Sequence, residues 1–476
     1  MNYVSKFLFF AAAGCVASLS SCNKLVNDYD VNPNAPTDAP ADLRLTGVEV
    51  AHGFVMSGEA ARTANIWAGV FTGEDRQYSA LQAYQVGLAD FDNMWTNSYY
   101  ATIQQARLTQ QKAQAIKNFQ LVGIAQVVEA QMVGTVTALW GNVPYSQALV
   151  ELTPGKFDTQ AEVYVAVQAL LTQAIANLGR TGVSPQGRDI YYGGDLSKWT
   201  AAAHSLKARY FLHMAGGLAT SPFYAQAIAE AQLGIAAPGG DMLMPYTGVI
   251  GSSANPYYDF IDNSRSGYMS ANGSYAATLL LNRVPDTGGL TQDSARYRYF
   301  FDDRGTASNY FDRDPNFVDG AFTPASAFPL VSFVETKAIL AEAQARNGSA
   351  ADALTALNAI RAANANTYAS GGGRYTPYTP ANFQTGGVLN AGGGQTAAQA
   401  LLKEILVEKY VSLVGQIEEF NDVRRTKNLI GVPKNVASAP SLPQRFLYPQ
   451  VEANTNPNTP AQISTSIFIK TPVNNN

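Results

Sequence analysis

Apolar residues recur every three to four positions over long stretches of the chain, a spacing that places them on one face of an α-helix. These stretches are rich in Ala, Gln, Val and Leu and poor in Pro; they cover residues 104–116, 121–140, 162–178 and 198–218. Glycine marks the end of the later three. Gly141 suits the left-handed position after a helix, and Pro144 prevents that helix from resuming. The N-terminal half is therefore predicted to be a series of helices joined by short turns.

A second helical region begins near residue 331. Small and apolar residues from Val334 to Ala345 share one face of a helix that ends at Asn347–Gly348. Ser349 begins the next helix and Asp352 stands three residues on, close to a capping box. Two antiparallel helices of this size, with small residues at their crossing, resemble a tetratricopeptide repeat. A glycine-rich surface loop and a second helix pair are expected to follow, over residues 371–394, 399–414 and 416–427.

Residues 234–316 differ from both helical regions. They are rich in Gly, Ser, Asn, Pro and Tyr, and only residues 275–284 have a clear helical pattern. Long irregular segments on a rigid scaffold commonly carry function. We therefore expect this part of the chain to contribute to a functional site.

The first 22 residues have the pattern of a bacterial lipoprotein signal. Lys6 supplies the positive charge, residues 7–16 the apolar core, and Leu19-Ser20-Ser21-Cys22 resembles a lipobox in which the Cys22 thiol receives diacylglycerol. The alternative is an ordinary signal peptide that happens to hold a cysteine. No later run of about 18 apolar residues is evident, so the mature protein is predicted to be anchored rather than membrane-spanning.

Composition narrows the possible partners. The 476 residues are 46% hydrophobic, which excludes wholesale disorder, and 32 Lys and Arg against 36 Asp and Glu leave no basic footprint for nucleic acid. Three His and two Cys offer little for a metal or thiol site, so neither a metal nor a cofactor is expected. In particular, His204 and His213 are interpreted as core or surface residues. The 25 Tyr, 22 Phe and 4 Trp of this weakly charged chain favour neutral ligands.

Catalytic signatures are weak, and no catalytic residue is predicted. The chain has no G-x-S-x-G or H-E-x-x-H motif. The acidic pairs Asp302–Asp303 and Glu418–Glu419 are adjacent in sequence and tend to point apart, whereas a glycosidase needs carboxyls about 5–9 Å apart across a sugar. Carboxylates distant in sequence could still meet in space. Residues 312–316 begin like a calcium loop but lack its later Gly and Glu, so an irregular loop is expected.

Five segments in order along the chain resemble the SusD/RagB family of outer-membrane lipoproteins. They are LWGNVPYSQAL at 139–149, DLSKWTAAAHSLKAR at 195–209, the helix pair at 339–361, EKY and FNDVRRT at 408–426, and RFLYP with Glu452 and NPN at 445–458. His204 stands where the family usually has Asn. Trp95, Trp140 and Trp199 lie at helix ends within or near these motifs and are interpreted as packing residues. Arg424 and Arg425 are predicted to form ion pairs with Glu404 and Glu408.

The resemblance implies a mainly α fold, in which tetratricopeptide-like helix pairs form a scaffold for an irregular, loop-rich ligand-binding part. It also implies capture of oligosaccharides at the cell surface and their delivery to a TonB-dependent, SusC-like outer-membrane barrel. A branch of the family binds peptides, and a ligand-free assembly scaffold is a further alternative. Family members displayed on the surface often carry acidic residues soon after the cysteine; here Lys24 comes first and Asp28 and Asp30 lie further on.

On this basis the chain divides into six predicted parts. They are a signal peptide at 1–21, the lipidated cysteine and tether at 22–42, N-terminal helical repeats at 43–233, an irregular ligand-binding part at 234–330, C-terminal helical repeats at 331–430, and an irregular tail at 431–476.

A glycan site should combine aromatic faces, on which the C–H surface of a sugar stacks, with polar partners for its hydroxyls. Two stretches outside the helical motifs offer both. The first holds Trp67, Arg76, Gln77, Tyr78 and Tyr84, the second holds Asn255, Tyr257, Tyr258, Asp259, Arg265 and Tyr268, and Tyr310 is a third candidate. Any one of these aromatic residues can instead belong to the core, so the hypothesis concerns the clusters.

Overall fold

The computed structural model of the protein describes residues 39–149, 154–303, 313–460 and 466–475. The predicted signal peptide, Cys22 and nearly all of the tether lie outside the described residues, as does Tyr310. Helices dominate what is described, and the strands are short. The predicted mainly α class is therefore confirmed.

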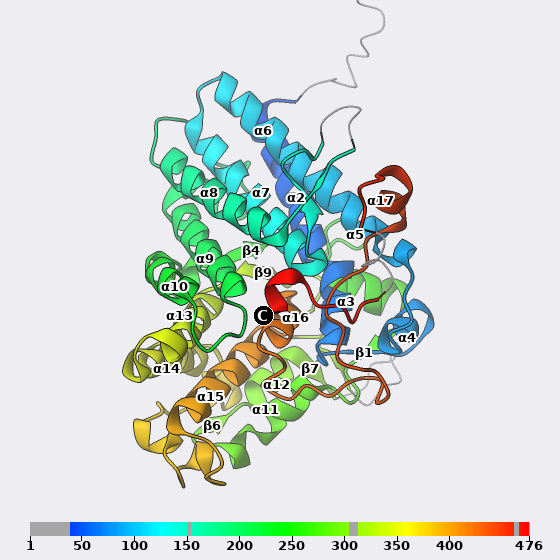
Figure 1. Ribbon diagram of the computed structural model, residues 1–476. Coiled ribbons are helices and arrows are strands. Elements are labelled where there is room, and N and C mark those ends of the chain that lie inside the picture. The colour runs from blue at the N-terminus through cyan, green and yellow to red at the C-terminus, as the bar shows by residue number, and fades with distance from the viewer. Residues whose placement is uncertain (1–38, 150–153, 304–312, 461–465, 476) are drawn as a thin grey trace, which may run out of the picture.

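Nine helices form an arc of antiparallel neighbours, seen from the upper middle to the lower left of Figure 1. They are α2 (Ala41–Ser57), α6 (Gln104–Ala115), α7 (Phe119–Trp140), α8 (Gln160–Leu178), α9 (Leu196–Ala215), α10 (Pro222–Leu233), α13 (Phe333–Asn347), α14 (Ala350–Thr367) and α15 (Ala397–Ser412). Each of the helices from α6 to α10 packs on the next, and α13 packs on α10, α14 and α15. The helical stretches predicted from periodicity are all present.

Local capping explains where several of these helices begin. The Thr159 hydroxyl accepts a hydrogen bond from the Glu162 amide at the start of α8, and the Glu162 carboxylate accepts one from the Thr159 amide. The predicted cap at Ser349 is also present, with its hydroxyl accepting from the Asp352 amide at 3.0 Å. Such caps satisfy N–H groups that the first turn of a helix leaves free. At the end of α7, Gly141 has the expected positive φ of 87°.

The central helix α7 contains an 18-residue apolar window, although no later apolar run of this length was predicted from the sequence. By length and composition it is able to cross a membrane, but its 18-residue apolar window is wholly buried inside the fold. Gly134 permits this close packing, because a Cβ there would lie 2.2 Å from the ring of Tyr210 on α9. Helix α7 thus forms the core of the scaffold.

Shorter elements cover the right and lower parts of Figure 1. The α-helices among them are α3 (Glu59–Trp67), α4 (Arg76–Gln82), α5 (Asp92–Thr96), α11 (Tyr275–Asp286), α12 (Ser294–Phe300), α16 (Glu418–Arg425) and α17 (Gln450–Thr455). The π-helical turns are η2 (Asn97–Ile103) and η4 (Tyr258–Ser264). The 3-10 turns are η1 (Leu88–Phe91), η3 (Pro238–Gly240), η5 (Ala369–Gly371), η6 (Pro380–Phe383), η7 (Val388–Asn390) and η8 (Pro472–Asn474). In the segment predicted to be irregular, α11 was expected, whereas α12 and η4 were not.

The described strands form five antiparallel two-stranded ribbons, β1–β5, β2–β3, β4–β9, β6–β10 and β7–β8. The strands are β1 (Thr72–Gly73), β2 (Val143–Pro144), β3 (Phe157–Asp158), β4 (Met242–Met244), β5 (Met269–Ser270), β6 (Thr291–Gln292), β7 (Phe301–Asp302), β8 (Asp314–Pro315), β9 (Phe328–Val331) and β10 (Arg374–Tyr375). Each of these ribbons joins segments more than ten residues apart in sequence, so they fix the loops to one another rather than forming a sheet.

Tryptophans predicted to serve packing do so. Trp95, Trp140 and Trp199 are buried, and their indole N–H groups donate to the Glu452 carboxylate, the Leu447 carbonyl and the Asp189 carboxylate, respectively.

The predicted ion pairs between Arg424–Arg425 and Glu404–Glu408 are wrong. Arg425 instead pairs with Glu342 and Asp422. Arg424 donates to backbone carbonyls, among them that of Ala138 at 3.0 Å. The two glutamates pair with arginines of other elements, Arg283 with both and Arg296 with Glu408. All of these side chains are buried, so part of the small charged fraction of this chain is used inside the core, where each charge needs a partner.

Candidate ligand-binding surface

The two stretches predicted to form the ligand site lie side by side. Strand β1, which precedes the first stretch, pairs with β5, which follows the second, so that Thr72 stands opposite Ser270. The Glu74 amide extends this pairing by donating to the Tyr268 carbonyl at 2.9 Å. Residues 74–79 and 258–268 are hereafter called the α4–η4 surface.

Four of the predicted residues are buried in the core, among them Tyr78, whose backbone belongs to this surface but whose side chain points beneath it. Trp67, Tyr78, Asn255 and Tyr257 are each at most 3% exposed. The Trp67 ring lies 5.4 Å from that of Phe446, and its N–H donates to the Leu81 carbonyl at 3.0 Å. In this structure these four side chains have no face to offer a ligand.

The buried Tyr78 supports the surface from below. Its ring lies 5.8 Å from that of Phe260 and 6.4 Å from that of Tyr268, and its hydroxyl accepts a hydrogen bond from Arg62 at 2.6 Å. Burial raises the pKa of Tyr78, and the neighbouring Arg62 opposes this shift. The Arg62 guanidinium also lies 4.4 Å from the centre of the Phe260 ring, a cation–π contact that orders this part of η4.

The other predicted residues of the α4–η4 surface reach solvent. Arg76, Gln77 and Arg265 are exposed, and Tyr258 and Tyr268 are half-buried. Neither tyrosine hydroxyl has a hydrogen-bond partner among the residues that the structure describes. These side chains therefore offer rings for stacking, free hydroxyls and exposed guanidinium groups, of which Arg76 pairs with Asp75 and Arg265 donates to the Ser264 carbonyl.

Asp259 is half-buried and shapes the edge of this surface. Its carboxylate accepts hydrogen bonds from the Gly251 amide and from the Asn263 side-chain amide, both at 3.2 Å. Asp259 thus holds the 246–253 loop against η4.

The backbone at both ends of α4 is unusual. Arg76 and Tyr84 have φ angles of 50° and 60°, a region that residues with side chains enter at a cost of about 1–3 kcal/mol. Tyr84 contacts the C-terminal part of the chain, since its hydroxyl accepts from the Asn435 amide and its ring packs on Phe468.

Sequence reasoning missed two supporting residues, Arg62 and Phe260. Phe260 directly follows the predicted run at 257–259, so the length of that aromatic run was a usable signal. Arg62 lies within an alanine-rich helix and had no such signal.

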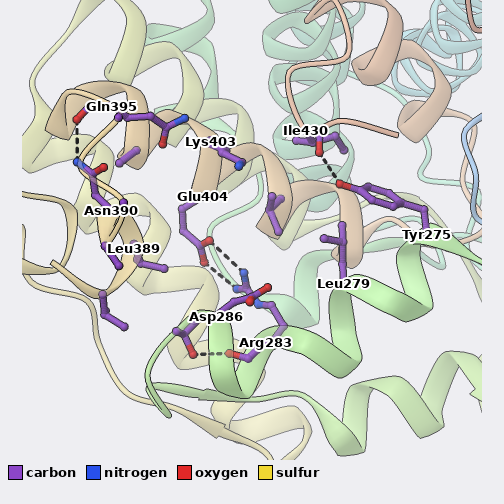
Figure 2. A pocket seen from close by; sticks show the side chains of 17 residues that line it. Tyr275, Leu279, Arg283, Asp286, Leu389, Asn390, Gln395, Lys403, Glu404 and Ile430 are labelled. Atoms are coloured by element: carbon purple, nitrogen blue, oxygen red, sulfur yellow. Dashed lines mark hydrogen bonds and ion pairs between the residues drawn. The ribbon is translucent and has the colours of Figure 1, made fainter. Parts of the chain in front are cut away.

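Figure 2 shows a separate cavity of about 480 Å³ between α11, α15 and the loop at residues 388–395. At its floor the buried Arg283 and Glu404 side chains pair at 2.8 Å. The Asn390 side chain donates to the Gln395 carbonyl, and the Tyr275 hydroxyl to the Ile430 carbonyl. The polar groups in this cavity are thus largely engaged in holding the loop and helices together.

The described ranges hold no cluster of three or more His, Cys, Asp or Glu side chains placed to bind a metal ion. His204 bonds to Glu230, and His213 lies between the Tyr164 hydroxyl and the Glu418 carboxylate. The geometry of the α4–η4 surface suits non-covalent binding by stacking and hydrogen bonding.

Solved structures share this fold over nearly their full length. A SusD/RagB family protein from Bacteroides thetaiotaomicron is 22% identical, with a TM-score of 0.68 over 91% of this chain and 98% of that one. A SusD homolog from Bacteroides fragilis is 16% identical, with a TM-score of 0.69 over 92% and 99%. A chitin-binding SusD homolog from Flavobacterium johnsoniae is 16% identical, with a TM-score of 0.65 over 88% and 92%. At these identities the likeness shows the fold.

No curated protein sequence matches the chain. The family model SusD-like_2, described as "Starch-binding associating with outer membrane", matches residues 49–449, which is most of the chain. This match confirms the resemblance drawn from the five sequence segments. The chain therefore belongs to the SusD-like family of starch-binding proteins that associate with the outer membrane.

Proposed function

We propose that the protein captures oligosaccharides, without catalysis, on its α4–η4 surface and passes them to a TonB-dependent outer-membrane transporter. The observation that carries the proposal is the convergence of two remote stretches, which leaves the rings and free hydroxyls of Tyr258 and Tyr268 beside the exposed Arg76 and Arg265. Sugar rings need such a combination of aromatic area and a few polar partners. The starch-binding description of the family and the chitin-binding relative support a glycan as the ligand class.

The anchor belongs to the same proposal. A lipid on Cys22 would hold the protein at the outer membrane, facing the cell exterior, with residues 23–38 as a tether. The outer-membrane association of the family supports this location. A Cys22→Ala variant is expected in the soluble fraction after membranes are washed, and a variant that stays membrane-bound would contradict the anchor.

Titration calorimetry tests the ligand class. The chain from residue 23 onward is titrated with chitotriose and, separately, with maltotriose, the trimers suggested by the names of the relatives. We expect saturable binding that Tyr268→Ala weakens about tenfold or more, since a stacking ring and a hydroxyl are removed together. The control is Tyr100→Ala, because Tyr100 is a 57% exposed tyrosine of the scaffold turn η2. Equal affinity of the Tyr268 and Tyr100 variants would contradict the assignment of the surface.

Two other outcomes would replace the proposal. Saturable binding of peptides and not of saccharides would make the protein a peptide-capturing member of the same fold. Absence of any ligand, with a barrel protein still co-purifying from detergent-solubilised membranes, would favour a scaffold that only assembles the transporter.

A further inference from the structure

Another hollow lies where α12 meets the end of α14; both helices are in the lower part of Figure 1, which draws the backbone alone. It measures about 780 Å³, within the range of about 300–1,000 Å³ typical of small-molecule sites. Its walls come from α12, β7, the last turn of α14 and η5. Gly371 lets η5 approach α12 closely, because a Cβ there would lie 2.6 Å from the Cβ of Ala295. The hollow is hereafter called the tyrosine pocket.

Aromatic rings form one wall of the tyrosine pocket. Tyr297, Tyr299 and Tyr368 line it, and the rings of the last two are tilted by 59° with centroids 6.0 Å apart. Tyr299 is 42% exposed although Tyr368 and Phe300 hold its ring in place. Tyr299 therefore presents a fixed, accessible aromatic face of the kind on which the C–H side of a sugar ring stacks.

The pocket also has unused hydrogen-bonding capacity. The hydroxyls of Tyr299 and Tyr368 have no hydrogen-bond partner within the described ranges. Their neighbours differ, since the Tyr297 hydroxyl donates to Asp303 and the Tyr375 hydroxyl to Asp293, each at 2.6 Å. These two hydroxyls are therefore available to a ligand rich in hydroxyl groups.

Charged side chains also line the pocket. Among the described residues, Asp302, Asp303, Asp319 and Arg298 line it, and Arg313 pairs with Asp303 at 3.2 Å. Arg298 donates one hydrogen bond to the Gly371 carbonyl at 2.8 Å, which holds its guanidinium at the rim. Since a guanidinium has five N–H groups, Arg298 keeps further donors for the hydroxyls of a sugar.

We infer that the tyrosine pocket is a second saccharide-binding site, in which a sugar stacks on Tyr299 and bonds to the Tyr368 hydroxyl and the Arg298 guanidinium. The inference rests on the proposed function, which supplies the ligand class. The tyrosine pocket shares no lining residue with the α4–η4 surface, so each site can be removed without touching the other.

The test is a calorimetric titration of the chain from residue 23 onward with chitotriose and maltotriose, carried to millimolar concentration. The variants are Tyr299→Ala, Tyr299→Phe, Tyr268→Ala and the exposed-tyrosine control Tyr100→Ala. Urea midpoints followed by circular dichroism establish that each variant is folded. We expect two classes of site in the unaltered chain. Tyr299→Ala should weaken one class about tenfold or more, since it removes ring and hydroxyl together, whereas Tyr299→Phe keeps the ring and should weaken it less.

The outcomes separate this inference from the proposed function. If Tyr268→Ala removes all binding and Tyr299→Ala none, the second site does not exist and the proposed function stands. If Tyr299→Ala and Tyr100→Ala weaken binding equally, the effect is not specific to the pocket and the inference is overturned. If the unaltered chain binds neither trimer in either class, it is the proposed glycan function that fails.

Discussion

Replacing Trp67 with alanine separates a role in folding from a role in binding. The Trp67 side chain is 0% exposed, and its ring contacts those of Phe91, Phe420 and Phe446 at centroid distances of 5.4–6.3 Å. Truncating a fully buried tryptophan costs about 3–5 kcal/mol in the free energy of unfolding. The Leu81 carbonyl also loses its donor, which places the expected cost at the upper end of that range.

Urea unfolding followed by circular dichroism measures this cost. A loss of about 4 kcal/mol lowers the equilibrium constant for folding roughly a thousandfold, so the urea midpoint should fall clearly. Trp67→Phe is the matched control, because it keeps most of the ring contacts and loses the N–H. Its cost should be smaller, about 1–2 kcal/mol. Under conditions where Trp67→Ala is folded, its saccharide affinity should equal that of the unaltered chain. An unchanged urea midpoint together with loss of saccharide binding would refute this reasoning and would indicate that Trp67 belongs to the ligand site.

Three further predictions concern stability. Gly134→Ala should destabilise the fold by about 1–3 kcal/mol, because the added methyl group overpacks against Tyr210. Its control, Gly47→Ala, lies on an exposed helical face with nothing within 4 Å and should stabilise the fold by about 0.5–1 kcal/mol. Urea midpoints that move in the same direction for both variants would contradict the packing argument. Burial, aided by nearby Arg209, lowers the pKa of His52 to about 3. The stability due to the neutral imidazole is therefore complete above about pH 6.5 and is lost as the pH falls toward 3. His52→Gln should make the urea midpoint depend less on pH across that window, and an unchanged pH profile would contradict this prediction. Burial raises the pKa of Glu408, but the surrounding arginines outweigh it and lower this pKa to about 2. The contribution of Glu408 to the free energy of unfolding is therefore present above about pH 4.5 and is lost toward pH 2. Glu408→Gln should cost about 3–5 kcal/mol at pH 7 and much less at pH 2, as measured by urea unfolding curves.

Helix positions and helix ends were predictable from local sequence. The cap at Ser349 and the turn at Gly141 depend on residues within four positions along the chain, and the scaffold helices on apolar spacing within one segment. These interactions involve only residues close together in sequence, so a local pattern is enough to predict them. The five family segments also lie in or beside such elements, so the family could be read from sequence.

Burial of individual aromatic residues was not predictable, because it depends on what covers them. Trp67 and Tyr268 are both aromatic residues of the predicted clusters, yet Phe446, hundreds of residues away, closes over Trp67 while Tyr268 stays half-exposed. Arg425 likewise pairs with Glu342 rather than with the acidic residues of the preceding helix, since helix packing decides which charges meet.

Sequence by itself therefore determined the helices, their caps, the predicted lipid-modification motif and the family resemblance, all of which are encoded over short distances. Tertiary structure decided which members of the two aromatic stretches reach solvent. It also brought these stretches together through the β1–β5 ribbon and assembled the tyrosine pocket from α12 and the end of α14. The physical reason is that a binding surface is made of residues left uncovered when segments remote in sequence pack, and no local pattern records what remains uncovered.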